Sequence, residues 1–280
     1  ADTITEVQLA FQRQKIHEFH LVLSKDFKKK AKYPALYQNI EEFMSKFLEI
    51  ADDMQLLYTE VPFGDDDSGE FTPLVTDLFT WISAFSVSKI RCFRYIATFI
   101  LYCFEDYLTN YTVELERDYL SRLTKQLSME QKKKRQNKST ITKISNSIEE
   151  LTSKKRQTDI LIDNISKITF IHRFKDVDDS IRKMSVEHLT TWIINNPEKF
   201  LKVSYLKYYG WLMSDDSSVV RSQVLRSLPL IISGHNGHVT DNAAIRQFYE
   251  RFKDILLEIA MKDIDMEVRL LAVQVLAEVS

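Results

Sequence analysis

Helix-breaking residues are almost missing from the middle of this chain. No Pro falls between Pro73 and Pro197, and no Gly falls between Gly69 and Gly210. Sheets need a turn every few residues, and turns draw on Gly and Pro for their backbone angles. A stretch of more than a hundred residues without either residue is typical of long helices. We therefore predict an all-α fold, and the 44% hydrophobic content is enough for a large core.

Residues 1–109 read as an N-terminal helical region. Apolar side chains recur at three- and four-residue steps over residues 4–60, and further helices are expected at 74–86 and 88–107. The most apolar run, residues 96–104, is flanked by charges and is too short to span a bilayer. We therefore expect a buried helix there and no membrane partner. Cys92 and Cys103 lie on that helix, roughly 16 Å apart at about 1.5 Å per residue, which is too far for a disulfide and favours a reducing compartment.

Residues 110–169 carry the alternating three- and four-residue apolar spacing of a coiled coil. A polar, basic segment at 132–140 divides this pattern into two stripes. The stripes consist of Leu120, Leu123 and Leu127, and then of Ile141, Ile144, Ile148, Leu151, Ile162, Ile165 and Thr169. Lys155 and Thr158 interrupt the second stripe. We predict a long antiparallel helical hairpin with a basic tip.

Residues 170–280 contain a repeat with the form Asp, five residues ending in Ile or Val, then Arg. It occurs at 176–182, 215–221 and 263–269, each time at the start of an amphipathic pattern, expected as helices at 182–194, 221–232 and 269–279. The intervals of 39 and 48 residues bracket the period of roughly 40–47 that is typical of HEAT repeats. The sequence thus predicts a HEAT-like helical-repeat solenoid.

Each position of the repeat has a physical reason. Short Asp and Ser side chains accept hydrogen bonds from the free backbone N–H groups at a helix start. The β-branched residue should pack inward, and the Arg is placed to pair with an acid of a neighbouring repeat. Asn196-Pro197 fits the same frame, because Pro is favoured at the first helical position after an Asn cap.

Charge marks two candidate DNA contacts, although the formal net charge of −2 names no partner class. Residues 111–167 hold thirteen Lys and Arg against eight Asp and Glu. The candidate contacts are Lys28, Lys29, Lys30 and Lys32, and at the hairpin tip Lys132, Lys133, Lys134 and Arg135. Lysine clusters attract phosphates without reading sequence, and no recognition helix is evident. Ordinary solvated helix faces are the alternative interpretation.

Catalytic and metal chemistry find little support in the sequence. No G-x-x-x-x-G-K-[ST], G-x-S-x-G or G-x-G-x-x-G motif is present. His235 and His238 have no further ligand at a suitable spacing, and the same holds for His17 and His20. The run at 65–67 reads as an acidic loop. We predict no enzyme, no catalytic residue, no metal and no cofactor.

Several segments together resemble the stromalins, the stromal-antigen HEAT subunits of cohesin. They are 170–176 (FIHRFKD), 204–211 (SYLKYYGW), 251–254 (RFKD) and, less closely, 90–95 (IRCFRY). The hairpin also sits where this family has one. Because the chain opens on Ala1 and ends inside a helical pattern at Ser280, we expect an N-terminal fragment of a longer, fungal member.

The resemblance implies a non-catalytic scaffold of sister-chromatid cohesion in the nucleus, on chromosomes. Its implied partners are the kleisin subunit, double-stranded DNA without sequence specificity, and regulator peptides with aromatic motifs. Most of the family's kleisin contacts lie farther toward the C-terminus. The positions that match the family's peptide pocket are Lys207, Tyr208, Trp211, Arg251 and Phe252. Two alternatives stay open: Trp211 as an ordinary core residue, and a generic HEAT-repeat adaptor for transport or coat assembly.

Overall fold

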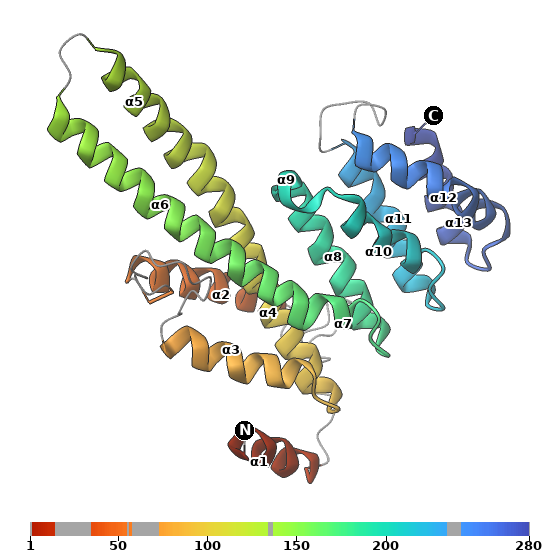
Figure 1. Cartoon of the computed structure of the whole chain (residues 1–280). Coiled ribbons are helices and arrows are strands. Elements are labelled where there is room, and N and C mark those ends of the chain that lie inside the picture. The colour runs from red at the N-terminus through yellow and green to blue at the C-terminus, as the bar shows by residue number, and fades with distance from the viewer. Residues whose placement is uncertain are drawn as a thin grey trace. The chain divides into compact units, whose positions relative to one another are not determined.

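The computed structural model describes residues 2–14, 35–54, 56–57, 73–133, 137–233 and 242–279. Within these ranges the regular elements are all helices, which confirms the all-α prediction (Figure 1). The chain divides into two compact units, Ala1–Thr169 and Phe170–Ser280.

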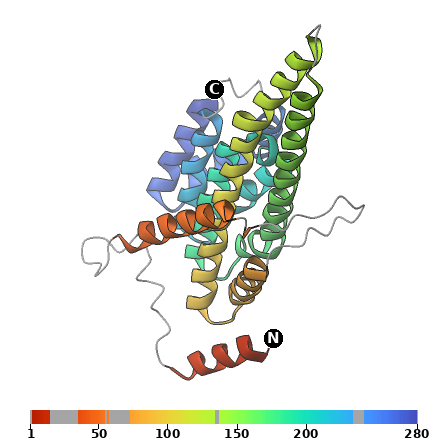
Figure 2. The ribbon, with the colours of Figure 1, turned by 90° about the vertical axis from the view of Figure 1, so that its left-hand side faces the viewer.

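The first unit is built around one long helix, α4 (Arg91–Glu114). Its elements are α1 (Asp2–Gln12), α2 (Leu36–Asp53), α3 (Pro73–Ser86), α4, the π-helix η2 (Leu115–Leu120), α5 (Ser121–Lys132) and α6 (Lys138–Ile165), followed by the π-helix η3 (Ser166–Phe170) at the boundary. Helices α2, α3 and α6 all pack against α4, and α5 packs against α6. Figures 1 and 2 both show α5 and α6 side by side, which confirms the predicted hairpin.

The helix expected over residues 88–107 is longer than predicted. It begins at Arg91, passes Tyr107 without a break, and continues through η2 into α5. Thr109 and Thr112, which have modest helix propensity, follow the predicted end but are buried in the packed unit. Tertiary packing therefore overrides a local signal that is weak for a helix.

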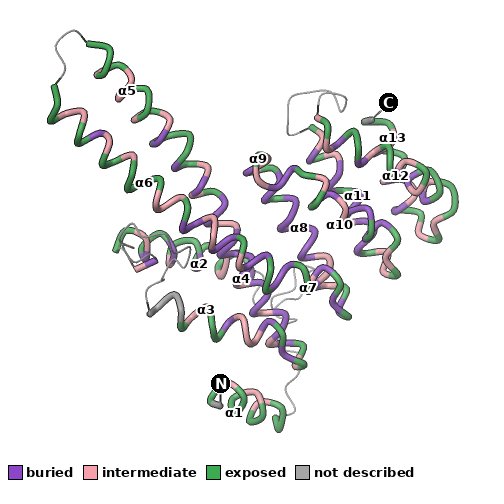
Figure 3. The backbone as a smooth tube through the Cα atoms, in the orientation of Figure 1, coloured by how far each residue is buried: buried purple, intermediate pink, exposed green. Residues whose placement is uncertain are grey.

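The hairpin is packed most tightly at its base. Ile162, Ile165 and Thr169 of the predicted stripe are buried there, whereas the part nearer the tip is mostly exposed apart from Ile144 (Figure 3). Both interruptions of the stripe make polar contacts. Lys155 forms an ion pair with Glu116 across the hairpin at 2.6 Å, and the Thr158 hydroxyl donates to the Lys154 carbonyl.

The apolar run at 96–104 lies inside α4 and is largely buried, as expected. Cys92 and Cys103 are both buried, and neither forms a disulfide. Among the described residues, no helix is long and apolar enough to cross a membrane.

The second unit consists of two layers of helices. Its elements are α7 (Ile171–Arg173), α8 (Asp179–Asn195), α9 (Pro197–Phe200), α10 (Val203–Leu212), α11 (Ser218–Ser233), α12 (Ala243–Lys262) and α13 (Met266–Val279). Helices α8, α11 and α13 pack in sequence as one layer, and α10 and α12 form the other. This is the stacking of a helical-repeat solenoid, as predicted.

A ladder of arginines and aspartates links successive repeats. Arg182 binds both carboxylate oxygens of Asp215, each at 2.7 Å. Arg221 binds both oxygens of Asp263, at 2.7 and 2.8 Å. Each of these arginines also donates to the backbone carbonyl of the aspartate that opens its own repeat, at 2.7 Å. The predicted pairing between neighbouring repeats is therefore confirmed.

The other positions of the repeat also behave as predicted, but the helix starts were placed too late. Ile181, Val220 and Val268 are 0% exposed. Helices α8, α11 and α13 each begin three residues before the repeat's Arg, not at it. The reason is visible in the first repeat, where the third residue, Asp178, caps the helix by accepting from Ser180 N–H. The Asn196 side chain caps α9 in the same way, with Pro197 at the helix start.

Candidate partner-docking site

Helix α10 turns Trp211 outward and both Tyr208 and Tyr209 inward. Trp211 is 50% exposed, whereas Tyr208 and Tyr209 are buried. The Tyr209 hydroxyl lies 2.8 Å from the Thr190 hydroxyl, and burial raises the pKa of Tyr209. The interpretation of Trp211 as a core residue is therefore wrong. Trp192, at 0% exposed, has that role instead.

The exposed indole rests on a cluster of aromatic rings. Its ring centroid lies 5.5 Å from Tyr208, in an edge-on arrangement, and 5.9 Å from Phe174. Tyr208 in turn contacts Phe174 at 4.6 Å and Phe170 at 5.0 Å. Edge-to-face and tilted pairs at these distances are favourable. Trp211 is thus held in place from below while its outer face stays open to solvent.

A cation completes this surface. The Lys207 Nζ lies 5.0 Å from the centre of the Tyr208 ring and 5.3 Å from the centre of the Trp211 ring. Ammonium groups within about 6 Å of an aromatic ring are attracted by its π electrons. The exposed part of the site is therefore an indole face with a positive charge beside it.

Helix α12 packs against α10, and Phe252 of α12 lies against Gly210 of α10. A Cβ atom added at Gly210 would lie only 2.1 Å from the Cζ atom of Phe252, so this close approach requires glycine. Phe252 is buried, and the exposed Arg251 side chain lies 5.4 Å from its ring centre. Phe252 is thus a support for α10, whereas Arg251 can meet a partner.

Of the five predicted residues, the structure brings Lys207, Tyr208 and Trp211 into direct contact and sets Phe252 against their helix. Sequence reasoning did not single out Phe174 and Gly210 as site residues. Phe174 had one usable signal, because Phe170 and Phe174 are four residues apart and so share a helix face. Nothing in the sequence marks the contact between Gly210 and Phe252.

Only part of the predicted DNA-binding set lies in the described residues. Lys132 is the last residue of α5 and Lys133 follows it; both are exposed, and Lys133 forms an ion pair with Glu130. Lys134 and Arg135 lie outside the described residues, as do Lys28, Lys29, Lys30 and Lys32. The histidines at 17, 20, 235 and 238 and the acidic run at 65–67 also lie outside them. In the part of the chain that is described, no group of three or more His, Cys, Asp or Glu residues could hold a metal ion.

Repeats joined by arginine–aspartate pairs, with an exposed tryptophan beside a cation, define a HEAT-type helical-repeat scaffold. Two family models identify the family to which this scaffold belongs. The STAG domain model matches residues 24–147, and the stromalin conservative domain model matches residues 175–253. The chain belongs to the stromalin family.

Individual relatives agree with this assignment. The chain is 54% identical to cohesin subunit SCC3 of Saccharomyces cerevisiae over 100% of its own length and 24% of that protein. It is 27% identical to cohesin subunit psc3 of Schizosaccharomyces pombe, over 97% of the chain and 26% of that protein. The solved structure of cohesin subunit Scc3 from Z. rouxii matches with a TM-score of 0.87 and 53% identity, covering 99% of the chain and 30% of that structure. The chain thus spans about a quarter of the length of these curated relatives.

Proposed function

We propose that this chain is the part of a non-catalytic cohesin subunit that docks regulator peptides and contacts DNA. The relatives are named as cohesin subunits, which favours this function over an adaptor in transport or coat assembly. Their names also support a place on chromosomes in the nucleus. The observation that carries the docking proposal is the half-exposed Trp211 with Lys207 beside its ring.

The site suits a peptide that carries an aromatic side chain next to a carboxylate. The aromatic group would pack on the open face of Trp211, and Lys207 or Arg251 would pair with the acid. Trp, Tyr and Arg dominate binding energy at many interfaces. Trp and Tyr also bury a large area at a small cost in conformational entropy. Tyr208 and Phe174 would hold the indole in place before binding and so reduce the cost of ordering it.

Replacing Trp211 with Ala tests the docking proposal. We expect binding of labelled peptides with one aromatic and one acidic residue to weaken roughly 30-fold, since such anchors contribute about 2 kcal/mol. Fluorescence anisotropy measures the affinity, and circular dichroism checks that helicity is unchanged. Leu230→Ala is the matched control, because Leu230 is another large apolar residue of this unit that is half exposed. Equal affinity of Trp211→Ala and the control would refute a docking role for this surface.

We also propose that Lys28, Lys29, Lys30 and Lys32, with the tip residues Lys132, Lys133, Lys134 and Arg135, contact DNA phosphates. The exposure of Lys132 and Lys133 supports the tip contact. Charge reversal at Lys28, Lys29 and Lys30 should weaken binding of arbitrary duplex DNA. It should also flatten the dependence of log K on log salt by about one unit per lysine. A gel-shift series at rising salt measures this, and an unchanged slope would show that these lysines do not contact DNA.

Kleisin binding is part of the same proposal. It rests on membership of the stromalin family, and this stretch of chain covers only about a quarter of the relatives' length. We expect these residues to supply at most a portion of the kleisin contacts. A pull-down of the kleisin with this chain and with the full-length subunit would compare the two directly.

A further inference from the structure

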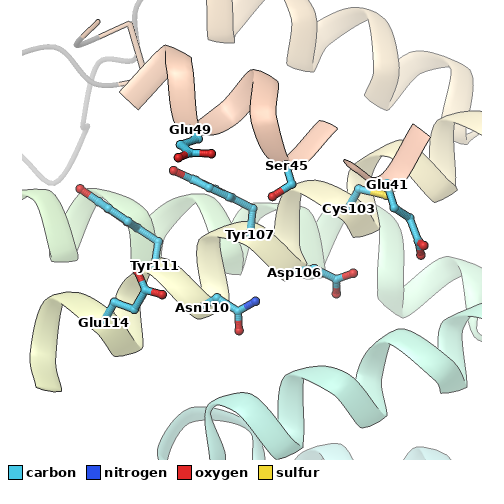
Figure 4. Close-up of a pocket in the computed structure, with 9 residues that line it drawn as sticks. All are labelled: Glu41, Ser45, Glu49, Cys103, Asp106, Tyr107, Asn110, Tyr111 and Glu114. Carbon is cyan, nitrogen blue, oxygen red and sulfur yellow. The ribbon is translucent and has the colours of Figure 1, made fainter. Parts of the chain in front are cut away.

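A groove between α2 and α4 has no part in the proposal above. It encloses about 460 Å³ and is lined by three rows of side chains, each spaced by one helical turn. The rows are Glu41, Ser45 and Glu49 on α2, then Cys103, Tyr107 and Tyr111 on α4, and finally Asp106, Asn110 and Glu114 on α4. Figure 4 shows these side chains and the two helices that carry them.

The walls of the groove are held firmly. Helix α2 packs on α4. The buried face of α2 includes Met44, Leu48 and Ala51. The Tyr37 ring lies 4.3 Å from the Phe99 ring of α4. A row of residues i, i+4 and i+8 spans roughly 12 Å at about 1.5 Å per residue. The groove is therefore a preformed trough, long enough for about four residues of extended chain.

Two tyrosines form an aromatic floor. The rings of Tyr107 and Tyr111 lie 6.0 Å apart and within 9° of parallel. Figure 4 shows both side chains on α4. Burial raises the pKa of the Tyr107 phenol, and the carboxylates of Asp52, Glu49, Asp53 and Glu114 add to this effect. Negative charge thus lies close to the floor.

The charge of the groove has one sign. Its lining holds four carboxylates, from Glu41, Glu49, Asp106 and Glu114, and no Lys, Arg or His among these described residues. The carboxylates stand along two walls and do not converge, and no group of three or more in the described chain could hold a metal ion. The groove therefore suits positive charge that is spread along a ligand, rather than a single ion.

We propose that this groove binds an arginine-bearing extended segment of a partner protein. Arg guanidinium groups are planar, stack on aromatic rings and form paired hydrogen bonds with carboxylates. The stacked tyrosines and the acidic walls offer both interactions at once. The ion pair of Glu49 with Lys46 at the rim, at 2.5 Å, is exposed. It is therefore weak enough to be exchanged for the ligand.

A labelled octapeptide of alternating Gly and Arg tests this proposal on the 280-residue chain. The variant Glu49→Gln/Glu114→Gln removes two charges from the groove and should weaken binding roughly fivefold, since exposed pairs contribute about 0.5 kcal/mol each. The matched control Glu42→Gln/Glu149→Gln removes two charges from exposed residues outside the lining. It has the same net charge as the first variant, so we expect it to bind the peptide as the unaltered chain does.

A second pair of variants tests the groove's shape without changing its charge. Ser45 is exposed on one wall, so Ser45→Trp should obstruct the groove and weaken peptide binding. Asn39→Trp, at an exposed position of the same helix outside the lining, should not. Equal losses in a groove variant and its control would overturn the proposal. So would equal binding of the peptide with Gln in place of Arg, or displacement of the peptide by micromolar calcium chloride.

Discussion

At the scale of single residues, the docking site depends on a glycine as much as on its aromatic rings. Gly210 precedes Trp211 and lies directly against the Phe252 ring. Because the ring occupies the space that any side chain at position 210 would need, the approach of α12 to α10 depends on that missing Cβ atom. The outward aim of Trp211 and the close packing of its helix are thus linked.

Replacing Gly210 with Ala should destabilise the protein by about 1–3 kcal/mol, the usual cost of overpacking a core. An ordinary helical Gly→Ala change has the opposite sign, since it stabilises by roughly 1 kcal/mol. Urea unfolding measures the difference. Phe252→Leu in the same chain should recover part of the loss, because the two residues are in contact. A stabilised Gly210→Ala variant would mean that Phe252 does not occupy this space.

At the scale of elements, the ladder between repeats fixes how neighbouring helices stack. The Arg221–Asp263 pair is nearly buried, and its two hydrogen bonds join α11 to the turn before α13. Removing one member of such a pair leaves an uncompensated buried charge. We expect Arg221→Leu to cost about 3 kcal/mol or more in urea unfolding. The exposed pair of Arg226 with Glu267 is the control, and Arg226→Leu should cost less than about 1 kcal/mol. Similar costs for both would contradict a structural role for the ladder.

The Arg221–Asp263 pair should also make the free energy of unfolding depend on pH. Burial alone would raise the pKa of Asp263, but hydrogen bonds from Arg221 and from the Asp265 N–H outweigh burial and lower it. A carboxyl whose pKa is lower in the folded state stabilises the fold above its unfolded pKa, near 4. That contribution is lost as the pH falls through the lower, folded value. Thermal unfolding from pH 6 to pH 2 should therefore show a smaller loss for Asp263→Asn than for the unaltered chain. Parallel curves would contradict this account.

Sequence patterns predicted the elements whose signals are local. The Asp, β-branched residue and Arg of the repeat predicted the ion pairs between neighbouring repeats, because each residue's role follows from its place at a helix start. The continuation of α4 past Tyr107 was missed, since Thr109 and Thr112 are helical through packing. Phe174 under Trp211, Gly210 against Phe252 and the groove between α2 and α4 were missed for a related reason. Each joins residues that only the folded chain brings together.

At the scale of the whole molecule, the two proposed kinds of binding surface belong to different units. The proposed peptide site lies on α10 and α12 in the unit Phe170–Ser280, whereas every proposed DNA contact lies in the unit Ala1–Thr169. A scaffold with separate sites should lose one kind of binding without losing the other.

The most direct test is a pair of titrations, one with labelled duplex DNA and one with the labelled aromatic and acidic peptide. Both are run on Trp211→Ala and on the charge reversal of Lys28, Lys29 and Lys30. We predict that Trp211→Ala binds the peptide roughly 30-fold more weakly and keeps its DNA affinity, and that the lysine variant binds DNA more weakly and keeps its peptide affinity. Undiminished peptide binding by Trp211→Ala, or one variant that weakens binding of both ligands while its helicity is intact, would contradict the account.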